Sequence, residues 1–437
     1  MQKEELKAKV FAAIDANAAK IIEIGETIWK NPEPGYREYK TAALTADILK
    51  SLGLPTQEKL GLTGVRSDMT FTEDGPAIAI LGEMDSLILP THPECDPETG
   101  AVHSCGHNAS MAGMLGAAIG LSAAGINSEL AGKIAFIAVP AEECIEIEKR
   151  LTMISEGTIA SLGGKGELIR RGVFDDIDLS MMLHSGGSYA YGTHNGFITK
   201  KVTFKGFSCH AAAPGGGINA LHAMTLAQSA VGLLRERWAG MNHTVRIHGI
   251  VTSGGDVVNI IPDKCKMEFL VRANKIETLK TLHKEFDRAM CGAAMAVGAG
   301  VEIETIPGYM PQYDDNELEQ FYCENSASLD PETPNNGAIS RCSSTDMGDL
   351  STIMPTLHGY TAGAAGTSHG VSYKIADKEK AYVVNAKILA GIAVDLLCDN
   401  AAAAKRIAAK REGKLSIKEY IALTDSLNAK VTREVEK

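Results

Sequence analysis

The apolar positions in the first half of the chain follow two patterns, one helical and one typical of buried strands. Apolar side chains recur at helical spacing over 3–30, 39–52 and 108–124. The first of these helices is expected to end at Asn31-Pro32, because proline disfavours a helical residue before it. Continuous apolar runs of strand length occupy 77–82, 133–139 and 179–184. Apolar strands that alternate with helices predict an α/β fold with a mostly parallel, mixed sheet and helices on both faces.

A different pattern begins near residue 195, where residues 197–205 alternate polar and apolar positions as a half-exposed strand does. The elements that follow are a helix at 218–237, strands at 244–251 and 265–272, a helix at 276–297 and a strand at 300–305. This β-α-β-β-α-β order is ferredoxin-like. We therefore predict an inserted α+β domain at 195–307, within a catalytic domain formed by 1–194 and 308–437. The stretch from 378 onward is helical and rich in Ala and Lys, and it either caps the sheet or forms a solvated helix pair.

Net charge and cysteine content limit the classes of binding partner and the cellular compartment that we expect for this protein. The 437 residues carry a net charge of -11, which argues against nucleic acid or an anionic membrane as the main partner. No apolar run is long enough to span a bilayer, and the N-terminal segment lacks the apolar stretch of a signal peptide. Nine cysteines, an odd number without framework spacing, fit a reducing cytosol better than a disulfide scaffold. We expect a cytoplasmic protein.

The sharpest local motif is His103-Ser104-Cys105-Gly106-His107-Asn108, which precedes a predicted helix. Cysteine and neutral histidine are good ligands for zinc-like ions, and a thiolate can bridge two metals. A buried cysteine with nearby capping histidines explains the same residues equally well.

A second motif, Glu142-Glu143, follows the strand 133–139. One carboxylate can bind a metal while its neighbour takes a proton from water; a solvated loop is the alternative, but α/β sheets place active sites at such strand ends.

Further candidates are weak one by one. His184 ends the strand 179–184, where a lone histidine is more often structural than a ligand, and His369 lies in a loop of small residues. Asp85 follows the strand 77–82 and could orient a ligand histidine, whereas the residues leave the role of Glu83 undecided. Taken together, a set of ligands suits two divalent ions that share a water, with Glu142 free for proton transfer. The set is Cys105, His107, Glu143, His184 and His369.

A glycine-rich loop at 208–221 runs into a predicted helix N-terminus, which attracts anions. His210 in this loop could polarise a carbonyl or stabilise an oxyanion. The glycines have an equally simple explanation as a turn and a helix cap, which requires no function.

In this combination the motifs resemble the zinc-dependent aminoacylase and carboxypeptidase superfamily. They are most similar to its amidohydrolase branch, which includes indoleacetyl-amino-acid hydrolases and aminobenzoyl-glutamate hydrolases. The resemblance covers nearly the whole chain in order. The matching motifs are Asn31-Pro32-Glu33 through Glu38, GEMDSL, HSCGHN, PAEE, SCHAAAPGGGINAL, GGDVVNIIPDK, STDMGD and GTSHG.

The resemblance implies metal ligands at Cys105, His107, Glu143, His184 and His369. It implies that Glu142 is the general base and later the general acid, and that Asp85 supports the ligands. His210 would stabilise the oxyanion, in many relatives from the partner subunit of a homodimer. Asn259 and Arg272 match positions that face the substrate or order the domain. Two divalent ions are implied, zinc first, with manganese, cobalt or nickel as alternatives.

Some positions depart from the branch. Asn108 and Ser110 stand where many members have aspartate and histidine, and the Glu83-x-Asp85 form resembles the aminobenzoyl-glutamate hydrolase subgroup. The loop 88–102 and the tail after 400 match no feature. The predicted function is hydrolysis of the amide bond of an N-acyl amino acid, an aminobenzoyl-glutamate-like compound or a dipeptide-like small molecule. The alternatives are an inactive metal-binding or peptide-binding relative, and a carbamoyl or ureido hydrolase.

Overall fold

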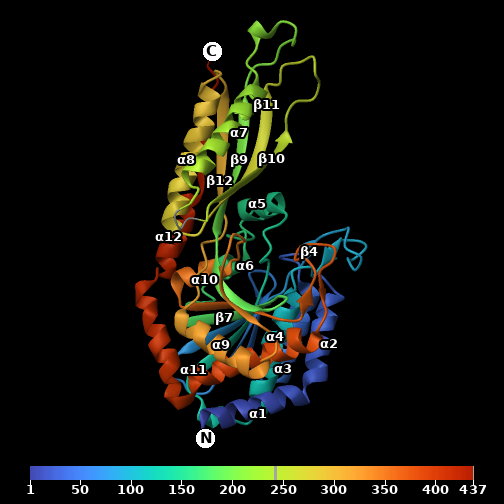
Figure 1. The fold of residues 1–437 in the computed structure, drawn as a ribbon, viewed down its shortest axis with the longest axis vertical. Coiled ribbons are helices and arrows are strands. Elements are labelled where there is room, and N and C mark those ends of the chain that lie inside the picture. The colour runs from blue at the N-terminus through green and yellow to red at the C-terminus, as the bar shows by residue number, and fades with distance from the viewer. Residues whose placement is uncertain (241–243, 437) are drawn as a thin grey trace. The chain divides into compact units, whose positions relative to one another are not determined.

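The structure, a computed structural model, describes residues 1–240 and 244–436 and divides into two compact units (Figure 1). The first unit is formed by 1–193, 313–340 and 349–417. The second is formed by 194–312, 341–348 and the C-terminal segment from 418. Residues 241–243 of the predicted inserted domain lie outside the described residues, and its boundaries at 195 and 307 stay a prediction.

The first unit is built on an eight-stranded mixed sheet in the order β1-β2-β6-β3-β7-β14-β8-β13. Its centre consists of parallel strands: β3 (Ala77–Glu83), β6 (Lys133–Val139), β7 (Leu179–Ser185) and β14 (Thr356–Thr361). The outer strands are β1 (Thr56–Leu60), β2 (Gly64–Thr70), β8 (Tyr189–His194) and β13 (Asn335–Arg341), and antiparallel pairing joins β1 to β2, β2 to β6 and β8 to β14. The predicted fold class is confirmed.

Burial on both sides explains why the central strands read as continuous apolar runs. All seven residues of β3 are buried, and Ile78 and Ile80 join the main hydrophobic cluster from alternate positions. Residues between them face the other side of the sheet and are buried too. Helices α4 (His107–Ala123) and α11 (Asn385–Ala408) pack on the strands, with α1 (Lys3–Ala16) and α2 (Ala18–Trp29) against α4 (Figure 1).

Two helical predictions need correction. The single helix expected over 3–30 is two helices, because Asn17 leaves the helical region and its side-chain amide donates to the carbonyl of Ala13. The remaining helix of this part, α3 (Tyr39–Ser51), lies at 39–52 as predicted.

The second correction concerns the C-terminal helix, which is more apolar and more deeply buried than the sequence pattern predicted. Within the described residues one helical stretch, Glu379–Gly413, is long and apolar enough to cross a membrane by length and composition, contrary to the expectation above. In the fold 94% of its most apolar window is buried, as in the core helix of a globular unit. Residues such as Ile388, Ile392 and Leu396 belong to the hydrophobic cluster, so α11 is a core element and not a solvated helix.

The second unit holds a five-stranded sheet in the order β10-β11-β9-β12-β17. Its elements follow the predicted β-α-β-β-α-β order: β9 (Gly196–Lys205), α7 (Ala220–Arg237), β10 (Arg246–Ser253), β11 (Lys264–Ala273), α8 (Ile276–Met295) and β12 (Gly300–Pro307). The C-terminal segment adds helix α12 (Ile417–Leu427) and strand β17 (Ala429–Arg433), which pairs antiparallel with β12. No pattern in the sequence indicated this fifth strand, and it covers one edge of the sheet.

Candidate metal centre

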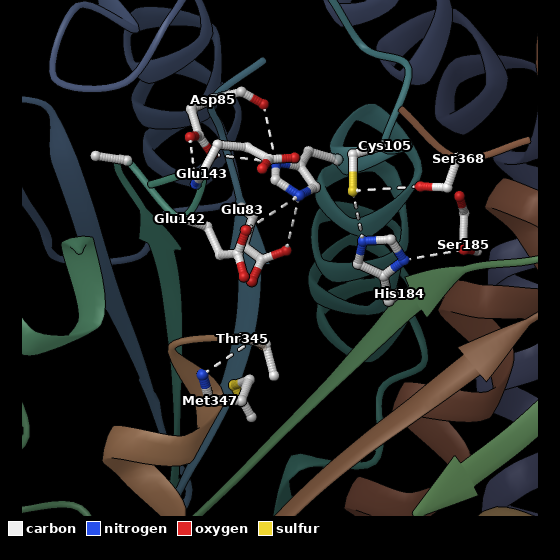
Figure 2. A network of polar contacts seen from close by, with 12 residues as sticks. Glu83, Asp85, Cys105, Glu142, Glu143, His184, Ser185, Thr345, Met347 and Ser368 are labelled. Atoms are coloured by element: carbon white, nitrogen blue, oxygen red, sulfur yellow. Dashed lines mark hydrogen bonds and ion pairs between the residues drawn. The ribbon is translucent and has the colours of Figure 1, made fainter. Parts of the chain in front are cut away.

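The parallel centre of the sheet brings the candidate side chains together, because β3, β6 and β7 end at the same edge. β3 ends at Glu83, the acid pair follows β6, and His184 lies at the end of β7 (Figure 2). Helix α4 begins at His107, directly after Gly106. Gly106 has a φ of 89°, and a Cβ there would lie 1.9 Å from the hydroxyl of Ser185. Glycine is therefore required for the chain to pass this close to β7.

Cys105 lies at the centre of the cluster. Its Sγ is 3.3 Å from Nε2 of His184 and 3.3 Å from Nε2 of His369. Nε2 of His369 is in turn 3.2 Å from a carboxylate oxygen of Glu143. Figure 2 shows Cys105 and His184 pointing toward each other.

These side chains form sets whose ligand atoms lie within 4.8 Å of one another. One set is Cys105, His107 and His184; another is Cys105, Glu143 and His369. The structure thus brings all five predicted ligands together, and the thiolate belongs to both sets. A third set joins His107 with Glu142 and Glu143.

The ring nitrogens of the histidines are oriented by acceptors on the chain. Nδ1 of His107 is 2.9 Å from the carbonyl oxygen and 3.0 Å from the carboxylate of Asp85. Nδ1 of His184 is 2.9 Å from the carbonyl oxygen of Ser185. Where these nitrogens donate, a ring that carries no second proton presents the lone pair of its Nε2 to the cluster. Asp85 also accepts a 2.8 Å hydrogen bond from the backbone N–H of Glu143, so one carboxylate positions two candidate ligands.

Electrostatics favour the ligand form of the thiol. Burial opposes ionisation of Cys105, but the imidazoles of His184 and His107 bring its pKa well below the usual range. Burial and the Cys105 charge raise the pKa of Glu143 to about 7. Hydrogen bonds to Cys105 and Glu143 raise the pKa of His369 to about 11. The protonation states of these three groups therefore depend on one another.

The donor set fits a pair of borderline-soft divalent ions. It combines a thiolate, three imidazoles and carboxylates, which is the chemistry that zinc-type ions prefer. Nε2 of His107 is buried and has no hydrogen-bond partner among the described residues. A buried ring nitrogen without a hydrogen-bond partner is costly unless something binds it. The assignment of individual ligands stays a prediction.

Sequence reasoning missed two residues that hold the turn before Glu142. Ala141 has a φ of 52°, and its N–H donates a 2.8 Å hydrogen bond to the carboxylate of Glu38. Glu38 is fully buried and also accepts a 2.6 Å bond from Thr63. The guanidinium of Arg150 donates to the carbonyl oxygen of Leu162 at 2.8 Å and lies 3.5 Å from that of Ala141. Glu38 lies within a matching N-terminal motif, which signals its importance without its role, and Arg150 carries no local signal.

Replacing Glu38 with leucine is expected to lower kcat by about 10- to 100-fold with little change in KM. Loss of its hydrogen bond frees the strained Ala141 turn, and a displacement of the base by about 1 Å is worth up to about 100-fold. Glu38→Gln is the matched control, since its amide oxygen can still accept from Ala141. Steady-state kinetics of both variants decides the point; an unchanged kcat in Glu38→Leu would show that the turn is held by other contacts.

The other predicted site residues belong to the second unit. His210 is exposed, and its Nδ1 accepts a 3.0 Å hydrogen bond from the backbone N–H of Ala212. The side chain of Asn259 is exposed as well. Arg272 donates to the hydroxyl of Ser344 at 2.7 Å and lies over the ring of Phe197, contacts that order its own unit. Roles of these three residues toward a substrate stay predictions.

The fold and the cluster define a class: an α/β protein with a thiolate-containing set of candidate metal ligands at the strand ends of a mixed sheet. The family profile of a peptidase dimerisation domain matches residues 192–293. The Xaa-Arg dipeptidase of Mus musculus is 30% identical over 416 residues, which span 90% of this chain and 89% of that protein. A p-aminobenzoyl-glutamate hydrolase chain of Escherichia coli is 27% identical, over 68% of this chain and 60% of that protein.

Solved structures agree on the fold. A putative aminohydrolase from methicillin-resistant Staphylococcus aureus superposes with a TM-score of 0.73 at 21% identity, over 89% of this chain and 99% of that one. A dinuclear metal-binding peptidase from Bacillus subtilis gives 0.66 at 22% identity, over 88% and 99%. The chain belongs to the M20 family of metallopeptidases. It is a metal-dependent hydrolase of amide bonds, as predicted.

Proposed function

We propose that the protein cleaves the amide bond of a small N-acyl amino acid or dipeptide, using two divalent ions, of which zinc is the first expectation. The observation that carries the proposal is the Cys105 thiolate, which belongs to two ligand sets with Glu142 beside them. Two relatives support the substrate class by name, one acting on Xaa-Arg dipeptides and one on p-aminobenzoyl-glutamate.

The chain's own residues supply the proton transfers in this mechanism. Ions held by Cys105, His107, Glu143, His184 and His369 would acidify water and polarise the substrate carbonyl. Glu142, whose carboxylate is 3.9 Å from Nε2 of His107, takes the proton of the attacking water and delivers it to the leaving amine. Glu143 is fixed by Asp85, so the adjacent base is held at a defined place. His210 stabilises the oxyanion, from the same chain or from a partner subunit.

Metal analysis and a substrate panel test this proposal. The purified protein, loaded with zinc, manganese or cobalt, is expected to hold two ions per chain. It is then expected to release amino acid from Xaa-Arg dipeptides, N-acyl amino acids or aminobenzoyl-glutamate. N-carbamoyl amino acids form a separate arm, and turnover in that arm alone would reassign the protein to the carbamoyl hydrolases. A folded preparation that binds no ion would overturn the proposal.

We also propose a homodimer formed through the second unit. β17 covers the β12 edge of the sheet, which leaves β10 as the edge with unpaired backbone groups. Ile250 and Val251 on this strand are 56% and 45% exposed, and Leu226 and Leu233 on α7, which packs on the same sheet, are 41% and 70% exposed. A free strand edge with exposed apolar side chains on it and on a helix of the same sheet is typical of a protein interface.

Val251→Lys is expected to convert the dimer to a monomer, because it places a charge on the proposed interface. Light scattering coupled to size-exclusion chromatography measures the mass. Met295→Lys, at a 55% exposed apolar position on α8, is the matched control and should stay dimeric. A Val251→Lys variant that remains a dimer would exclude the β10 edge.

A cytoplasmic location is part of the same proposal. All nine cysteines are free thiols, and the proposed chemistry requires Cys105 in its reduced form.

A further inference from the structure

Glu83, the last residue of β3, is fully buried and has different neighbours at its two carboxylate oxygens. Oε1 accepts a 2.6 Å hydrogen bond from Nζ of Lys165, whose side chain is also fully buried. Oε2 lies 3.3 Å from Nε2 of His107 and has no hydrogen-bond partner among the described residues. Figure 2 shows the Glu83 carboxylate beside that of Glu142. The proposed mechanism gives Glu83 no role.

The contact between Glu83 and His107 brings a carboxylate oxygen against a ring nitrogen, and something positive must lie between the two atoms. With Nδ1 of His107 donating to Asp85, Nε2 carries a lone pair whenever it does not hold a proton. A carboxylate oxygen is also only an acceptor. Two such atoms repel at 3.3 Å unless a proton or a cation lies between them. Because the same nitrogen belongs to the set with Cys105 and His184, a cation is the solution that the rest of the cluster shares.

The distance suits a metal ion. Zinc lies about 2.0–2.2 Å from an imidazole nitrogen or a carboxylate oxygen that binds it. Two such ligand atoms 3.3 Å apart would make an angle of roughly 105° at the ion, which is close to tetrahedral.

A second contact within the unit explains how Lys165 reaches Glu83. Helix α6 (Gly164–Arg170) begins so close to the turn after β6 that a Cβ at Gly164 would lie 1.6 Å from the carbonyl oxygen of Pro140.

We propose that Glu83 is a further metal ligand: Oε2 binds the ion that His107 holds, while Lys165 holds Oε1. The ammonium restricts the carboxylate to one oxygen and offsets part of its buried charge. The inference rests on the proposed function, since it requires the ions. Lys165 is then a positioning residue, and neither residue belongs to the ligand set that the sequence predicted.

A purely structural ion pair is the competing explanation, in which Glu83 serves only to neutralise Lys165. The two explanations differ for the double variant Glu83→Gln/Lys165→Met, which removes both charges. If Glu83 only neutralises Lys165, metal binding returns when both are replaced. If Glu83 is a ligand, the double variant binds metal as poorly as Glu83→Gln.

The experiment titrates zinc into the full-length metal-free protein in competition with a chromophoric chelator. Wild type and Lys165→Met are expected to bind two ions. In Glu83→Gln and in the double variant, the dissociation constant of one ion should rise by more than about 100-fold. Replacing a residue that only supports a ligand raises it by about 10- to 100-fold. With cobalt, the visible absorption of that ion should change in the same two variants. Binding of both ions by Glu83→Gln within about tenfold of wild type, or recovery in the double variant, would overturn the assignment.

Folding is controlled separately. Circular dichroism of the metal-free variants shows whether each is folded, and Glu83→Asp keeps the carboxylate but shortens its reach. This variant should bind the second ion with an affinity between those of wild type and Glu83→Gln; an affinity as weak as that of Glu83→Gln in a folded protein would count against ligation. Wild-type protein that binds no ion would sink the proposed function itself, whereas two ions in wild type and in Glu83→Gln would sink only the role of Glu83.

Discussion

Replacing Glu142 with alanine is expected to abolish measurable turnover while both ions stay bound. The carboxylate is the group left for proton transfer once the five predicted ligands are assigned, and it lies at the metal cluster with only 8% of its surface exposed. General acid–base catalysis contributes about 100- to 10,000-fold to the rate, so kcat should fall by a factor of at least about 100. The measurement combines steady-state kinetics on an active substrate with metal analysis of the same preparation.

Glu156→Ala is the matched control for this result, because it removes an exposed carboxylate at the end of helix α5 (Ile147–Ser155), which follows the acid pair. Its kcat should match that of wild type. Near-normal activity in Glu142→Ala would exclude the base role, and loss of metal from Glu142→Ala would make this residue a ligand instead.

Cys105→Ala is expected to weaken binding of both ions and to remove activity with them. The thiolate is the member common to two ligand sets, so its loss takes one donor from each. Removal of a ligand should exceed the roughly 10- to 100-fold loss of metal affinity that follows from changing a supporting residue. Titration with cobalt adds a specific readout, since sulfur-to-cobalt charge-transfer absorption should be present in wild type and absent from the variant.

Cys291→Ala, in α8 of the second unit, serves as the control and should retain both ions and the absorption band. If Cys105→Ala kept two tightly bound ions, the shared-thiolate arrangement would be wrong, and the carboxylates and imidazoles alone would have to hold the metals.

The order of elements was accessible from the sequence wherever burial alone sets the pattern. The runs at 77–82, 133–139 and 179–184 are strands whose two faces are both covered, so nearly all of their positions are apolar. Asn17 could not be recognised as a break, because the apolar spacing continues across it. β17 was missed because its alternating, charged sequence becomes a strand only through pairing with β12.

The candidate ligands were chosen by residue type and by position at predicted strand ends, and the parallel register then explains why they meet. Glu83 remained undecided and Lys165 unnoticed, because their pairing joins positions 82 residues apart in the chain. Glu38 and Ala141 are likewise 103 residues apart. Such contacts leave no local pattern.

By itself, the sequence determined the class of fold, the catalytic class and the residue types of the metal centre. These depend on local periodicity, and on motifs whose chemistry belongs to the side chains themselves. Only the tertiary structure decided that one thiolate belongs to two ligand sets, that Asp85 orients both His107 and Glu143, and that the buried carboxylate of Glu83 faces a ring nitrogen of His107. Those facts depend on the register of parallel strands and on the close approach of α4 and α6 to the strand ends, which depend on the packing of the whole unit.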